Sequence, residues 1–170
     1  MDFEIKELTK ENLEETIRLI ENIFTLNIDD KDHPRKWIPA SLEPKTKKSK
    51  ALYKTTGCAE IKQFVAIKNK KVIGVTGYFT FKKDSTEADW LAWFAVEKSQ
   101  RQKGVGTKLL QFAIDSARKH NKKYLRLYTS ESKEERGAQK LYDRFCIKIV
   151  KKEKSPYQKG SMITYRELTL

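Results

Sequence analysis

Two neighbouring segments of strand-like composition place the strongest constraint on the fold of this chain. Residues Gln63 to Lys68 and Lys71 to Lys82 are rich in Val, Ile, Phe, Tyr and Thr, and only the polar pair Asn69-Lys70 separates them. Such residues favour strands, and a two-residue polar link is typical of a β-hairpin. We therefore expect two antiparallel strands here, and any fold for the chain must include such pairing.

The rest of the chain alternates strand and helix patterns around this hairpin. Further strands are expected over Phe3 to Leu8, Ala88 to Val96, Tyr124 to Thr129, Ile147 to Val150 and Met162 to Leu168. Helices are expected over about residues 10–25, from Gly104 to near residue 120, and from Glu134 to Phe145. This order predicts an α/β fold with a mixed sheet, and 170 residues fit a single domain.

An irregular insert at about residues 27–60 interrupts this alternation. It begins with an acidic cluster (Asp29, Asp30, Asp32), passes three prolines (Pro34, Pro39, Pro44) and ends in a basic tract (Lys45, Lys47, Lys48, Lys50). Prolines and single-sign charge runs are typical of solvated loops. We therefore expect mostly loop here, with at most a short helix.

Composition narrows the class of protein. The 36 Lys and Arg against 23 Asp and Glu give a net charge of +13, which favours anionic ligands and nonspecific attraction to nucleic acid. The longest apolar run, Trp90 to Val96, is far shorter than the roughly 20 residues that span a bilayer. The acidic start, Met1 to Glu4, does not resemble a signal peptide, so we expect a cytoplasmic protein without membrane association. Cys58 and Cys146 lack metal-ligand spacing, so we expect reduced thiols and no metal.

The segment between the strand ending at Val96 and the following helix carries the chemistry. Gly104 and Gly106 remove two Cβ atoms where that helix begins, so an anion can approach the free N–H groups of the first turn. The pattern predicts a phosphate cradle. A dinucleotide fingerprint would need a third glycine where Leu109 stands, and the P-loop spacing of Gly and Lys is also absent.

The pattern that remains, Arg/Gln-x-x-Gly-x-Gly/Ala, is matched by Arg101, Gly104 and Gly106. Together with the strand before it, the helix after it and the run Ala138 to Tyr142 in the next helix, it resembles the GNAT N-acetyltransferase superfamily. The resemblance implies one N-acetyltransferase domain over residues 1–170. Its sheet would be mixed and largely antiparallel, with six to seven twisted strands flanked by helices and central strands splayed around the arm of coenzyme A.

The resemblance also implies a site for acetyl-CoA as co-substrate. The backbone of Phe94, Ala95 and Val96 would pair with the pantetheine arm. The pyrophosphate would bind at Arg101, Gln102, Lys103, Gly104, Val105, Gly106 and Thr107. Tyr142 resembles the family tyrosine that protonates the departing thiolate.

Four places depart from the family pattern. The family often has Pro where Lys98 stands, Gly where Gln102 stands, Asn where Glu135 or a neighbour stands, and Gly-Phe where Cys146-Ile147 stand. The missing Asn would remove a hydrogen bond to the cofactor.

The resemblance predicts an enzyme that moves an acetyl group to a primary amine of a small molecule or peptide by direct attack in a ternary complex. The acidic cluster hints at a cationic acceptor, and a homodimer is one candidate assembly. Asp89, Glu87 and Glu131 are candidate proton acceptors, and the base stays unassigned. The alternatives are a noncatalytic acyl-CoA-binding regulatory module and an RNA- or ribosome-binding protein.

Overall fold

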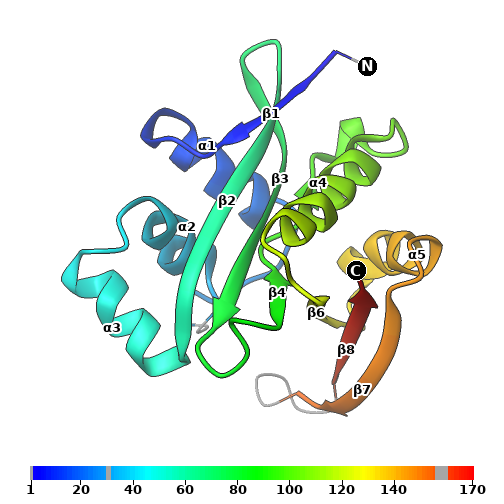
Figure 1. Ribbon diagram of the computed structural model, residues 1–170. Helices are drawn as coiled ribbons and strands as arrows, with labels where there is room; N and C mark the ends of the chain where they lie inside the picture. Colours follow the sequence, from blue (N-terminus) through cyan, green and yellow to red (C-terminus); the bar gives the residue numbers. More distant parts are fainter. Residues whose placement is uncertain (1, 30–31, 156–160) are drawn as a thin grey trace.

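The protein folds into an eight-stranded sheet with helices packed on both faces (Figure 1). The computed structural model describes residues 2–29, 32–155 and 161–170. Within them the strands run in the order β1-β2-β3-β4-β6-β8-β7, and β5 pairs with β3. Their bounds are β1 (Glu4–Glu7), β2 (Cys58–Lys68), β3 (Lys71–Phe81), β4 (Ala88–Leu91), β5 (Ala95–Val96), β6 (Tyr124–Ser130), β7 (Lys148–Lys154) and β8 (Met162–Thr169).

The expected mixed and largely antiparallel α/β sheet is confirmed. The hairpin of β2 and β3 lies next to the edge strand β1, with Lys68 opposite Lys71, and the central strand β4 pairs in parallel with β6. The sheet has eight strands rather than six or seven, because the chain from 88 to 96 forms two short strands. Asp30 and the tip of the expected last loop, residues 156–160, lie outside the described residues.

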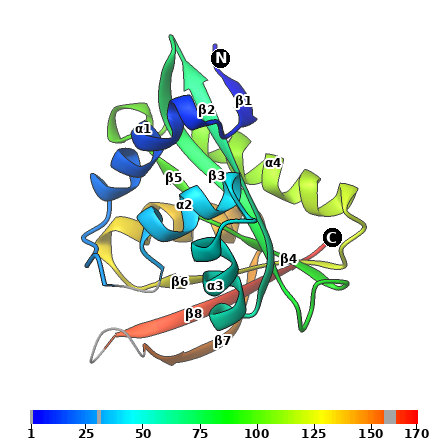
Figure 2. The same cartoon turned by 90° about the vertical axis from the view of Figure 1, so that its left-hand side faces the viewer.

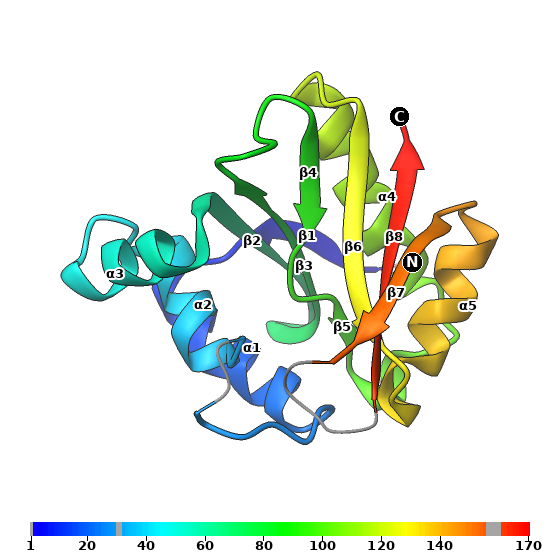
Figure 3. The ribbon, with the colours of Figure 1, turned by 90° about the horizontal axis from the view of Figure 1, so that it is seen from below.

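Helices cover the two faces of the sheet unequally (Figures 1 and 2). Their bounds are α1 (Lys10–Glu21), α2 (Pro34–Leu42), α3 (Lys47–Thr56), α4 (Val105–Lys119) and α5 (Arg136–Arg144), with short 3-10 turns η1 (Lys98–Gln100) and η2 (Lys133–Glu135). On one face, Ile20 of α1 and Ile38 of α2 are fully buried against Val65 and Val75 of the β2–β3 hairpin. Figure 3 shows that no helix of the described chain covers this same face where it continues over β6 and β8.

On the other face, α4 and α5 pack against β4 and β6. Leu110 and Ile114 of α4 meet Leu125 and Leu127 of β6 in a second buried cluster. The apolar spacing along α4 explains this contact, because residues three and four apart share one side of a helix. Within the described residues, none of the helices combines the length and the apolar character needed to cross a membrane.

The expectation of a mostly irregular segment at 27–60 was wrong. Two helices, α2 and α3, occupy residues 34–56, and β2 begins at Cys58. Pro34 stands in the first turn of α2, where the missing N–H costs nothing, and the Thr46 side chain caps α3 by accepting from Ser49 N at 3.2 Å. The prolines therefore mark helix boundaries as well as loops, with the exception of Pro39, which lies inside α2.

The single strand expected from Ala88 to Val96 is also corrected by the structure. Strand β4 ends at Leu91, and the Ala92 N–H donates to Gly77 O of β3 at 3.0 Å. Strand β5 then continues along β3 alone, with Val75 opposite Ala95. The chain thus leaves β6 after Trp90, and the sheet splits at this point.

Candidate functional site

The turn before α4 has the backbone geometry of an anion cradle. Gly104 has a φ of +78°, in the left-handed region that favours glycine, and α4 begins at the next residue. The N–H groups of the first helical turn have no carbonyl partner within the helix, and the positive end of the helix dipole lies behind them. This end of α4 therefore offers several N–H donors to a negatively charged group.

Gly106 stands where three elements meet. A Cβ added at Gly106 would lie 3.6 Å from Val96 Cγ2, 3.6 Å from Leu141 Cδ2 and 3.8 Å from Phe94 Cζ. The structure thus brings together predicted site residues from β5 and α4 with the helix α5 that carries Tyr142. A side chain at position 106 would enter the space between these elements.

The sheet is open beside β5. Pairing between β4 and β6 runs from Ala88 opposite Tyr124 to Trp90 opposite Arg126, and within the described residues no pairing follows. β5 pairs with β3 on one side, whereas β6 continues to Ser130 along β8. On the side away from β3, the backbone of Phe94 to Val96 therefore has no strand partner within the described residues, and we call this open side the gap.

Tyr142 is buried at the base of α5. Its ring centroid lies 6.1 Å from that of Phe94, and the Arg166 guanidinium lies 5.9 Å from the Tyr142 ring centroid. Burial strongly raises the pKa of Tyr142, the negative charge of Glu135 raises it further, and Arg166 opposes the rise. The phenol is consequently neutral throughout the physiological range and can donate a hydrogen bond.

The basic side chains of the loop lie outside this convergence. Arg101 folds back, and its Nε donates to Val96 O at 3.1 Å, at the end of β5. Gln102 and Lys103 are exposed. The side chains of Gln102 and Lys103 are therefore available to a ligand at the protein surface, whereas that of Arg101 is bonded to the end of β5.

Sequence reasoning missed a polar cluster at the end of β6. The Glu135 carboxylate accepts hydrogen bonds from the Ser130 N–H at 3.1 Å, from the Ser130 hydroxyl at 2.8 Å and from the Thr129 hydroxyl. Gln139 Nε2 donates to Thr129 Oγ1 at 3.1 Å and to Ser130 O at 3.2 Å. Burial raises the pKa of Glu135 from its ordinary 4.5 even though the bonds from Ser130 lower it. The only sequence signal was the acid at a position where the family often has Asn.

Two of the three candidate proton acceptors lie in structural contacts remote from the gap. Asp89 is fully buried, and its Oδ2 lies 2.6 Å from His120 Nδ1 at the far end of α4. Glu87 pairs with Arg126, at 3.5 Å, at the start of β6. Glu131 is exposed just after β6, where its Oε1 lies 3.2 Å from Lys152 Nζ.

Comparison with known families decides what this arrangement is. The model of the acetyltransferase (GNAT) family matches residues 23–146. The chain belongs to this family. The match spans the gap, the turn before α4 and all of α5, and it agrees with the resemblance seen in the sequence.

Solved structures of GNAT proteins share the fold. A GNAT-family protein from Desulfovibrio desulfuricans is 16% identical with a TM-score of 0.79, and the match covers 98% of each chain. Arabidopsis thaliana Naa50, solved with the bisubstrate analogue CoA-Ac-MVNAL, is 17% identical with a TM-score of 0.71 over 100% of both chains. A GNAT-family acetyltransferase from Elizabethkingia anophelis with acetyl-CoA bound is 17% identical with a TM-score of 0.63, again over 100% of both chains. A comparison with curated protein sequences found no significant match.

Two departures from the GNAT pattern keep the backbone that glycine would favour. Gln102 has a φ of +60° and Cys146 a φ of +56°, and both stand where the family often has Gly. The Ile147 N–H donates to Tyr142 O at 3.0 Å just after Cys146, which closes the end of α5. At both places the chain therefore adopts, with a less suitable residue, a turn that favours glycine.

Proposed function

We propose that this GNAT protein transfers the acetyl group of acetyl-CoA to a primary amine of a small molecule or peptide, by direct attack in a ternary complex. The observation that carries the proposal is the convergence at Gly106. It joins a cradle for anions, an unpaired strand edge and a buried phenol in one continuous region. These are the three parts that binding a long phosphorylated thioester and releasing its thiol require.

The cradle and the gap support one direction for the co-substrate. The pyrophosphate binds the N–H groups at Gly104 to Thr107, where the helix dipole favours negative charge. From there the arm runs along the backbone edge of Phe94 to Val96, where Arg101 Nε also donates to Val96 O, as an added strand would. The thioester therefore ends near Ala92, where β4 and β6 separate.

Tyr142 serves the departing sulfur. The amine nitrogen forms a bond to the acetyl carbonyl carbon, the carbon–sulfur bond breaks, and the amine loses one proton as the sulfur gains one. The raised pKa of Tyr142 exceeds that of an ordinary thiol, near 8.5, so the phenol stabilises the thiolate chiefly by donating a hydrogen bond. Water carries the proton of the amine, since Asp89 and Glu87 lie in contacts remote from the gap and Glu131 pairs with Lys152.

The test is release of free thiol from acetyl-CoA by the purified protein. Polyamines, aminoglycosides, amino acids and peptides with free amino termini are supplied in parallel, and the products are identified by mass spectrometry. We expect thiol release that depends on the amine and yields the acetylated amine. Binding of acetyl-CoA without turnover on any amine would instead indicate the noncatalytic module.

A further inference from the structure

Three aromatic rings lie side by side on the face of the sheet that α1 and α2 partly cover, and the first of them, Trp90, is only 8% exposed beside Trp37 of α2. Trp90 of β4, Tyr128 of β6 and Tyr165 of β8 have ring centroids 6.2 to 6.5 Å apart. Their neighbours along the strands, Leu91 and Leu127, pack toward α4 and α5, so the three rings point to the opposite face. We call Trp90, Tyr128 and Tyr165 the aromatic floor.

The aromatic floor begins where the sheet splits. Trp90 is the last residue of β4 that pairs with β6, and its partner there is Arg126. Tyr128 lies two residues further along β6. The proposed path of the co-substrate runs from Gly104 along β5 toward Ala92, so its thioester end arrives beside these rings. A nucleophile that reaches the acetyl carbon from this face of the sheet must pass over them.

Two carboxylates, those of Asp32 and Glu153, accept hydrogen bonds from the tyrosines of the aromatic floor. The Tyr128 hydroxyl donates to Asp32 Oδ2 at 3.4 Å, across from the loop before α2. The Tyr165 hydroxyl donates to Glu153 Oε1 of β7 at 2.7 Å, and Glu153 also pairs with Lys151. Asp32 therefore places negative charge beside Tyr128, which is 38% exposed and lies just beyond the point where β4 and β6 separate.

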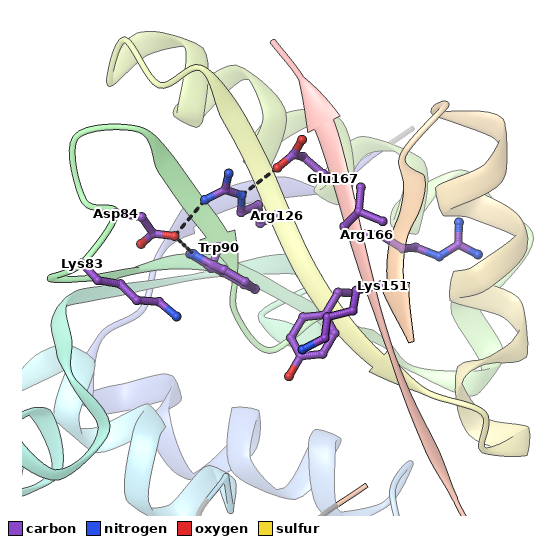
Figure 4. Close-up of a pocket in the computed structure, with 9 residues that line it drawn as sticks. Lys83, Asp84, Trp90, Arg126, Lys151, Arg166 and Glu167 are labelled. Atoms are coloured by element: carbon purple, nitrogen blue, oxygen red, sulfur yellow. Dashed lines mark hydrogen bonds and ion pairs between the residues drawn. The ribbon is translucent and has the colours of Figure 1, made fainter. Parts of the chain in front are cut away.

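Protein cations occupy the other end of the floor. A hollow between the rings and β7 is lined by Lys83, Arg126 and Lys151 as well as by Trp90 and Tyr165 (Figure 4). Lys83 Nζ lies 5.3 Å from the Phe81 ring centroid, and Lys151 Nζ lies 5.5 Å from that of Tyr165.

Arg126 is held in place by two carboxylates. Its Nη1 donates to Asp84 at 3.0 Å and its Nε to Glu167 at 2.8 Å, while the Trp90 indole donates to the same Asp84 oxygen (Figure 4). This network fixes the edge of the Trp90 ring and leaves its surroundings rigid. An apolar ligand in the hollow would meet the rings of Trp90 and Tyr165, which stand at 88° to each other, whereas a second ammonium would meet Lys83.

We infer that the aromatic floor binds the acceptor and selects a primary amine attached to one aromatic or large apolar group. The inference rests on the proposed function. The ammonium of the incoming acceptor lies near Asp32 and Tyr128, and its apolar part packs on Tyr165 and on the small exposed part of Trp90. Polyamines fit poorly, because their second cation meets Lys83, whereas Lys151 is already paired with Glu153. This narrows the cationic acceptor that the acidic cluster suggested to an amine with a single charge.

The first test compares acceptors and a variant of the floor. Tryptamine and phenylethylamine are free amines of the proposed class. A peptide with amino-terminal Met presents an amine beside an apolar side chain at a chain end. Spermidine and ethylamine carry no aromatic or large apolar group. We expect kcat/KM for tryptamine to exceed that for spermidine and ethylamine at least tenfold. Comparing kcat/KM for tryptamine with that for the peptide shows whether the acceptor is a free amine or a peptide terminus. Tyr128→Leu should raise the KM for tryptamine roughly tenfold while leaving the KM for acetyl-CoA unchanged.

A matched control and a second variant keep the test decisive. Tyr124→Leu changes the same residue type at the start of β6, four positions away on the same face, and should leave the KM for tryptamine unchanged. Lys83→Glu alters an exposed residue and should raise kcat/KM for spermidine several-fold. Spermidine used as well as tryptamine, or an unchanged tryptamine KM in Tyr128→Leu, would overturn the inference while leaving amine acetylation in place. Absence of turnover on any amine would instead overturn the proposed function.

Discussion

At the scale of single residues, the account depends most on the phenol of Tyr142. Its ring is enclosed by Phe94 and Arg166, so removing only the hydroxyl leaves the packing in place. We expect Tyr142→Phe to lower kcat about a hundredfold, the range typical of a lost hydrogen-bond donor to a developing anion, with little change in the KM for acetyl-CoA. Steady-state thiol release with the best amine measures this. A kcat within twofold of the wild type would remove Tyr142 from the reaction.

Glu135 makes stability depend on pH. Because burial raises its pKa in the folded protein above the ordinary 4.5, the folded state holds the proton more tightly than the unfolded state. Its contribution is therefore fully favourable below pH 4.5 and falls as pH rises through the raised folded value. We expect Glu135→Gln to gain stability relative to the wild type as pH increases from 4 to 8.

Urea unfolding of both proteins across that range measures the difference. The same series on Glu134→Gln is the control, because Glu134 is exposed and its pKa is lowered instead. A stability difference between Glu135→Gln and the wild type that does not change with pH would contradict the assignment.

At the scale of elements, the turn after α5 stores backbone strain. Cys146 has a φ of +56° and is exposed, so its side chain gains little burial in return for a conformation that glycine adopts freely. We expect Cys146→Gly to stabilise the fold by about 1 kcal/mol and to raise the melting temperature by a few degrees. Asn121→Gly is the control, since Asn tolerates its φ of +55° better. A lower melting temperature in Cys146→Gly would show that the thiol contributes packing.

The sequence predicted the elements whose signals are local. The hairpin turn at Asn69-Lys70, the glycine before α4 and the apolar side of that helix each follow from a few adjacent residues, and each is present. The break of 88–96 into β4 and β5 has no local signal, because neither Gly nor Pro occurs between Leu91 and Ala95. It arises when the chain loses β6 as a partner, which is a property of the whole sheet.

In the candidate site too, only the parts with a local sequence signal could be predicted. The predicted backbone of β5 and the start of α4 lie together, because the motif itself specifies a strand, a turn and a helix. The cluster of Glu135, Thr129 and Gln139 was not predictable, since its members meet only through the packing of α5 against the end of β6. The same holds for the aromatic floor, whose three rings come from three strands.

At the scale of the whole molecule, the net charge of +13 acts on every anionic ligand. Attraction between a basic surface and a phosphorylated co-substrate weakens as salt shortens the range of electrostatic forces. We expect the Kd for acetyl-CoA to rise several-fold between about 0.05 and 0.5 M NaCl, an interval over which the Debye length falls to about a third. A Kd that does not depend on salt would show that the phosphates make no charged contacts.

The most direct test of the account is calorimetric titration of the purified protein with acetyl-CoA and, separately, with acetyl-pantetheine, which has the same thioester arm but no pyrophosphate. The account predicts saturable binding of acetyl-CoA at one site per chain and binding of acetyl-pantetheine at least tenfold weaker, because the cradle before α4 holds the pyrophosphate. Equal binding of the two ligands, or no heat from acetyl-CoA at millimolar concentration, would contradict it.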